Sequence, residues 1–169
     1  MSNLPVELTE AQRRIAAAYD PALLEDAGHR LITLLAANLA RAERSEGAVL
    51  PWVDPEDGIQ EAASWLRETA VSAAAGTQPE LPERLADLVR TMLARGLNLH
   101  DPRYIGHQVP APVPLAGLFD AVGSVTNQVM AIYEMGPWAT AVEQAMVREL
   151  GAAIGWAAGT FAGTVTHGG

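Results

Sequence analysis

DPALLEDAGHRLITLLAANL, residues 20–39, is the stretch that decides the fold class of this chain. The pair Asp20–Pro21 is typical of a helix start, because aspartate caps free backbone N–H groups and proline has the φ angle of a first helical residue. Apolar residues then recur at helical spacing, and they are Leu24, Ala27, Leu31, Leu34, Leu35 and Leu39. The pattern predicts one long amphipathic helix that fades near residues 45–47.

Similar patterns on both sides of this helix predict a mainly α chain. A capping-box spacing at residues 9–12 opens a helix that runs through about residue 19. Another helix follows Pro55 and ends before the loop at 75–79, and a fourth stops at Gly96. Further helices are predicted at about 115–132 and 138–154, and the run at 163–166 is expected to form a short β-branched strand.

Composition and charge narrow the class of protein. Of the 169 residues, 49% are hydrophobic and 18% are charged, which is typical of a globular chain. All 11 basic residues are arginine, and with 20 acidic residues the net charge is -9. A negative charge of this size argues against nucleic-acid or anionic-membrane partners. Cysteine is absent, which excludes disulfides and thiolate metal sites. With neither a signal peptide nor a membrane span expected, we predict a cytoplasmic protein.

The segment at residues 98–114 differs from the helices around it. It contains four prolines and little periodicity, so we expect an extended loop, and loops of this length in compact domains are often functional. His107 and Gln108 stand in this loop between a glycine and a proline, where polar side chains can be directed at a ligand. The spacing of His100 and His107 does not match a zinc-binding pair on a helix, and no metal site is predicted.

The run at 163–169, GTVTHGG, resembles the first half of an anion-binding turn. Two glycines, Gly168 and Gly169, allow the backbone to approach a phosphate closely, and Thr166 adds a hydroxyl. Glu143, on the last predicted helix, is expected to face solvent or the helix end. These observations alone do not identify a reaction, since Gly–Gly also occurs in many ordinary turns.

Taken together, the motifs resemble the pyridoxal-phosphate-dependent group II amino acid decarboxylases, the family of glutamate, aromatic amino acid and 2,4-diaminobutyrate decarboxylases. The resemblance runs from about residue 24 to the last residue and depends on the order of several motifs. They are Asp101-Pro102-Arg103-Tyr104-Ile105-Gly106-His107-Gln108, Asn127-Gln128, Tyr133-Glu134-Met135-Gly136-Pro137, Thr140-Ala141-Val142-Glu143 and Thr166-His167-Gly168-Gly169.

The resemblance implies an organisation and a chemistry. Residues 1–97 correspond to a helical segment that wraps the partner of a homodimer, and 98–169 to the start of the large cofactor-binding domain of an α/β, fold-type-I enzyme. His107 and Gln108, in the loop at 98–114, would contact the amino acid substrate. Thr166, Gly168 and Gly169, in the turn at 163–169, would bind the phosphate of pyridoxal 5'-phosphate. The family is a carboxy-lyase that releases CO2 from an L-amino acid through an imine and a quinonoid intermediate.

One departure from the family is large. The chain contains no lysine, so it cannot form the imine, and no catalytic residue is assigned within it. We therefore expect the lysine to come from a C-terminal remainder present as a second chain, with the break after Gly169 arising from self-cleavage, proteolysis or truncation. His167 stands where relatives usually have a small residue or proline, so its role is open.

Two alternatives stay open, and the amino acid substrate is not identified. The chain could be a noncatalytic helical scaffold or regulatory protein derived from such an enzyme, or part of another pyridoxal-phosphate lyase or an aldehyde-forming enzyme. The apolar faces of the last two helices are expected to form an exposed patch unless another part of the protein covers them. The residues concerned are Val122, Val125, Val129, Ile132, Val142, Met146 and Ile154.

Overall fold

The structure is a computed structural model that describes residues 6–75, 80–106 and 108–166. Helices dominate the described residues and no strand occurs among them, which confirms the prediction of a mainly α chain. The chain divides into two compact units, Met1–Ala111 and Pro112–Gly169. The predicted organisation into segments 1–97 and 98–169 of a larger enzyme stays a prediction.

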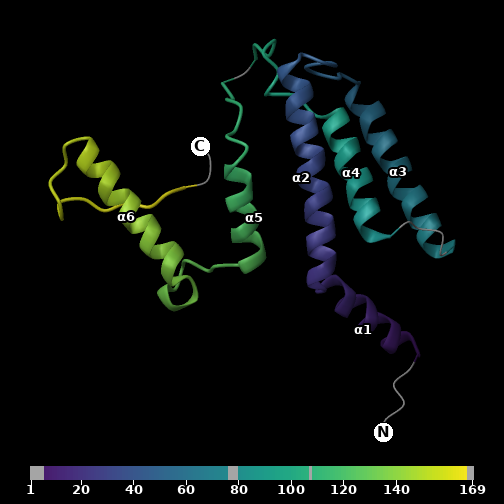
Figure 1. Cartoon of the computed structure of the whole chain (residues 1–169), viewed down its shortest axis with the longest axis horizontal. Helices are drawn as coiled ribbons and strands as arrows, with labels where there is room; N and C mark the ends of the chain where they lie inside the picture. The colour runs from purple at the N-terminus through teal and green to yellow at the C-terminus, as the bar shows by residue number, and fades with distance from the viewer. Residues whose placement is uncertain (1–5, 76–79, 107, 167–169) are drawn as a thin grey trace, which may run out of the picture. The chain divides into compact units, whose positions relative to one another are not determined.

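The first unit contains α1 (Val6–Ala18), α2 (Pro21–Glu43), α3 (Pro55–Ala75) and α4 (Leu81–Arg95). The predicted start of α2 is confirmed, because the Asp20 carboxylate accepts a hydrogen bond from the Ala22 N–H at 2.9 Å. The predicted stop of α4 is also confirmed, with Gly96 at its C-cap. Helix α4 packs against α2 and lies beside α3, as Figure 1 shows.

Ion pairs rather than large buried side chains connect these helices. Arg30 of α2 reaches Glu83 of α4 at 2.7 Å, and Arg95 of α4 pairs with Glu61 of α3. All four side chains are about half exposed, so each pair contributes little to stability. Among the described residues the buried apolar side chains are those of Ala42 and Ala86. The helices are therefore in close contact, but most of their large apolar side chains remain exposed.

The second unit contains α5 (Ala116–Thr126), the 3-10 turn η1 (Tyr133–Met135) and α6 (Pro137–Ala153). The prediction of a helix through residue 132 is wrong, because α5 ends at Thr126. Its C-cap Asn127 has the left-handed angles φ 48° and ψ 53°, and its N–H donates to the carbonyl of Gly123. Asparagine adopts this conformation more readily than most residues, so the helix stops there.

After α6 the chain reverses through two turns, in which Gly155 has a φ of +88° and Gly159 a φ of +79°, and residues 161–166 return along the helix. Figure 1 shows this extended segment in yellow, crossing α6. The predicted strand at 163–166 is wrong: the described part of the chain offers no neighbouring strand to pair with it. Instead the N–H of Val165 and the hydroxyl of Thr164 donate to the carboxylate of Glu143.

The packing of Phe161 against Gly151 gives the first prediction. A Cβ added at Gly151 would overlap the Phe161 ring, whose centroid lies 5.3 Å from that of Trp156. We expect Gly151→Ala to destabilise α6 by about 1–3 kcal/mol, because overpacking displaces the ring. Native-state amide hydrogen exchange of α6 measures this change. The control Gly123→Ala enters open space in α5 and should be neutral or slightly stabilising. Equal effects of the two substitutions would contradict this account.

Candidate functional site

The first half of the prolyl loop is held by a contact between Asp101 and Arg103. The backbone N–H and the Nε of Arg103 both donate to Asp101 Oδ1 at 2.9 Å, and Nη2 of Arg103 donates to Oδ2 at 2.8 Å. The Asp101 side chain is fully buried, whereas that of Arg103 is half exposed. A bidentate pair of this kind fixes orientation as well as distance, so the loop has a defined path at this point.

The same loop is tied to the connection between α2 and α3. Nη2 of Arg103 also donates to the carbonyl of Gly47 at 2.8 Å, and the N–H of Asn98 donates to the carbonyl of Val49 at 2.8 Å. These two contacts join segments about 50 residues apart in sequence. We refer to Gly47, Val49, Asn98, Asp101 and Arg103 as the loop clasp.

The charges in the loop clasp stabilise each other. Hydrogen bonds from the Arg103 side chain and backbone lower the pKa of Asp101 from 3.8 to about 2. The Asp101 carboxylate in turn raises the pKa of Arg103 above its ordinary value. Asp101 is therefore ionised at neutral pH, and its chemistry is that of a hydrogen-bond acceptor rather than a proton-transfer group.

Tyr104 belongs to the first motif, but no role was predicted for it. Its ring lies against Gly106, where an added Cβ would be 2.6 Å from a ring carbon. Its hydroxyl is buried and has no hydrogen-bond partner among the described residues. A buried polar group without a partner costs about 1–3 kcal/mol, so this hydroxyl is a place where a bound polar group would be favourable. In the sequence, the only sign of this contact is a glycine two residues after the tyrosine, which leaves room for the ring.

Of the two residues predicted to contact substrate, the structure describes only Gln108. Gln108 follows the loop clasp and is exposed. His107 lies outside the described residues, so its predicted role stays a prediction.

The segment predicted to approach a phosphate is held by Glu143 of α6. Oε1 of Glu143 accepts from the Thr164 hydroxyl at 2.6 Å and from the Val165 N–H at 2.9 Å. These two bonds, the first being the stronger cause, lower the pKa of Glu143. Its predicted position facing solvent or the helix end is therefore wrong. Thr166 follows directly and is exposed, while Gly168 and Gly169 lie outside the described residues.

The predicted substrate-binding residues and the predicted phosphate-binding residues belong to different compact units. Gln108 belongs to the first unit and Thr166 to the second. In the sequence, Gln108 follows the Asp101–Arg103 contact, and Thr166 follows the contact of Glu143 with Val165.

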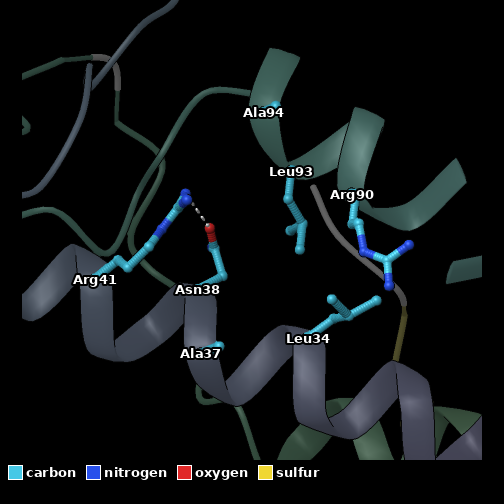
Figure 2. Close-up of a pocket in the computed structure, with 7 residues that line it drawn as sticks. All are labelled: Leu34, Ala37, Asn38, Arg41, Arg90, Leu93 and Ala94. Atoms are coloured by element: carbon cyan, nitrogen blue, oxygen red, sulfur yellow. Dashed lines mark hydrogen bonds between the residues drawn. The ribbon is translucent and has the colours of Figure 1, made fainter. Parts of the chain in front are cut away.

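A separate groove of about 340 Å³ lies between α2 and α4. Figure 2 shows Leu34 and Leu93 extending toward each other across it, and Arg41 donating to the side chain of Asn38. The other lining residues are Ala37, Arg90 and Ala94. Arg90 is already paired with Asp87 at 2.5 Å. The lining contains no nucleophile or acid–base group, so we do not assign a reaction to this groove.

No group of three or more histidine, cysteine, aspartate or glutamate residues within the described ranges of the chain is arranged to hold a metal ion. Over the same ranges, no helix is long and apolar enough to cross a membrane. Comparison with protein-family models, with curated proteins and with solved structures found no match to the chain.

The lowered pKa of Asp101 predicts an acid-dependent loss of stability. Because the pKa is lower in the folded state, the contribution is fully present above pH about 4 and is lost as the pH falls toward 2. The urea midpoint of the native protein should therefore fall over this range. The fall should be smaller in Asp101→Asn, which has no carboxylate to protonate. Glu68→Gln, an exposed residue of α3, is the matched control and should behave like the native protein. An identical acid profile for Asp101→Asn would contradict this role.

Proposed function

We propose that this chain is the N-terminal part of a pyridoxal-phosphate-dependent group II amino acid decarboxylase, a cytoplasmic carboxy-lyase that acts on an L-amino acid. The observation that carries the proposal is the ordered series of motifs from residue 101 to residue 169. Asp101 bonds Arg103 within the first motif of the series, and Glu143 bonds Thr164 and Val165, which directly precede the last motif. Held loops of this kind suit binding, because a ligand gains most from groups whose positions are already set.

The loop clasp supports a role in substrate binding. Asp101 and Arg103 fix the backbone a few residues before Gln108, whose amide has both donors and an acceptor. In the proposed enzyme, the Gln108 amide donates to the substrate carboxylate and holds it in the orientation needed for loss of CO2. The buried Tyr104 hydroxyl supplies a second polar group in the same loop.

The Thr166 hydroxyl is a donor that fits the phosphate group of the cofactor. Thr166 is exposed at the end of a segment held to α6, and a hydroxyl in this place is a suitable donor to a phosphate oxygen. In the proposal Gly168 and Gly169 add backbone N–H groups. When bound, the cofactor accepts the electron pair of the broken bond between Cα and the carboxylate. The chain's own residues bind and orient the reactants and help to exclude water.

The imine-forming lysine belongs to another part of the protein in this proposal, because this chain has no lysine. The proposed enzyme therefore contains a lysine-bearing part and works as a homodimer with two copies of each part. The exposed apolar faces of α5 and α6 support this arrangement. Val122 and Val125 of α5 and Val142 and Met146 of α6 are exposed as predicted. Outside these helices, Ile132 and Ile154 are exposed as well, and Val129 is half-buried.

The absence of lysine also favours a second candidate function. A noncatalytic scaffold or regulatory protein derived from such an enzyme would keep the helices and the loop clasp without needing the imine. The two functions differ in whether a lysine-bound cofactor accompanies the chain.

Borohydride reduction distinguishes these two functions. We expect the natural protein, purified with its partners and reduced, to yield a pyridoxyl-lysine on a part of the protein outside residues 1–169, because borohydride traps the imine. Denaturing liquid chromatography with mass spectrometry detects the adduct. An unreduced sample serves as the control. Detection of this chain alone, without an adduct on any copurifying part, would contradict the enzyme and favour the scaffold.

The exposed faces predict the behaviour of the chain when it is produced alone. We expect the 169-residue chain to oligomerise or aggregate, since large apolar patches associate in water. Sedimentation velocity measures the size of the species. Replacing Phe119 and Val122, both exposed on α5, with serine should reduce association. A monodisperse monomer that unfolds cooperatively would contradict the need for a covering partner.

A further inference from the structure

The extended segment at 161–166 lies along α6 in a regular register. Phe161 contacts Gly151, Gly163 lies beside Val147, and Val165 is bonded to Glu143. Thus each step of two residues along the segment matches a step of four residues back along the helix. These steps have nearly equal lengths, because four helical residues rise about 6 Å and two extended residues about 6.6 Å. The register can therefore continue over several contacts without strain.

The close contacts along this register restrict sliding. Gly151 admits the Phe161 ring because it has no side chain. A Cβ at Gly163 would lie only 3.2 Å from Val147 Cγ1, so the backbone there is also close to the helix. A shift of the segment by one residue would place the side chain of Ala162 or Thr164 where Gly163 now stands, and would move the Phe161 ring away from Gly151. The segment therefore reaches Glu143 with a defined alignment.

Glu143 is the polar contact at the end of this register. Its Oε1 accepts from a side chain and from the backbone of two consecutive residues, Thr164 and Val165. Two bonds to neighbouring residues fix the direction of the chain as well as its position. The next residue is Thr166, which is exposed. In the proposed function its hydroxyl donates to the phosphate.

We propose that Glu143 is a positioning residue that holds Thr166 for the phosphate group of the cofactor. This inference rests on the proposed function and adds a residue to its phosphate site. The carboxylate does not attract the phosphate, since both are negative. Its role is to accept the Thr164 and Val165 hydrogen bonds, and an amide oxygen at the same place can accept them as well.

Binding of pyridoxal 5'-phosphate to the complete protein, compared with binding of pyridoxal, tests this role. We expect Glu143→Ala to weaken pyridoxal 5'-phosphate binding about tenfold or more and to leave pyridoxal binding nearly unchanged, because only the phosphate contact is lost. Glu143→Gln should bind pyridoxal 5'-phosphate at least as tightly as the native protein, since it keeps the acceptor and removes a negative charge. Glu149→Ala, an exposed residue of the same helix, is the matched control and should not change either affinity.

Amide exchange of Val165 provides a readout that does not depend on cofactor. Its N–H should be protected in the native protein and in Glu143→Gln, and exposed in Glu143→Ala. If Glu143→Ala does not fold, Thr164→Val removes only the hydroxyl bond and should weaken pyridoxal 5'-phosphate binding by a smaller factor.

Three outcomes would overturn the inference, and they have different meanings. If the native protein binds pyridoxal 5'-phosphate and Glu143→Ala binds it equally well, the positioning role alone fails. If Glu143→Ala weakens pyridoxal and pyridoxal 5'-phosphate equally, the effect is not directed at the phosphate. If the native protein binds neither compound, the proposed function fails together with the inference.

Discussion

The buried carboxylate of Asp101 is the constraint on which the arrangement of the first unit's loops depends. Removing an ionised carboxylate from water is costly unless its oxygens receive hydrogen bonds. Arg103 provides three such bonds from its backbone and side chain. Because Arg103 also binds the carbonyl of Gly47, the prolyl loop and the connection between α2 and α3 take their positions together. The Asp101 carboxylate, which would be unstable without these bonds, thus fixes the positions of the prolyl loop and of the connection between α2 and α3.

Glu143 performs a related task in the second unit, with backbone and hydroxyl donors in place of an arginine. In both cases an acidic side chain accepts hydrogen bonds from a segment that is itself neither helix nor strand. This matters in a chain whose buried apolar residues, among those described, are Ala42 and Ala86. With little apolar core to hold the loops, these polar contacts determine their shape. The proposed binding residues Gln108 and Thr166 lie just beyond these contacts.

Much of the fold could be predicted because helix starts and stops are local. Asp20 and Gly96 act within one turn, so their roles were readable from neighbouring residues. The contact of Glu143 with Val165 spans 22 residues, and β-branched composition alone wrongly suggested a strand. The end of α5 depends on the left-handed backbone at Asn127, which competes with an apolar pattern that continues further. The link from Arg103 to Gly47 has no periodic signal at all.

The register between α6 and the returning segment has a consequence for how this region can change during evolution. Contacts from Phe161 to Val165 are matched to successive helical turns, so inserting or deleting one residue there would bring every later side chain to the opposite side. The turn between Gly155 and Phe161 precedes those contacts and has no such requirement. Length variation among descendants of this chain should therefore collect in that turn, whereas residues 161–165 should keep their number.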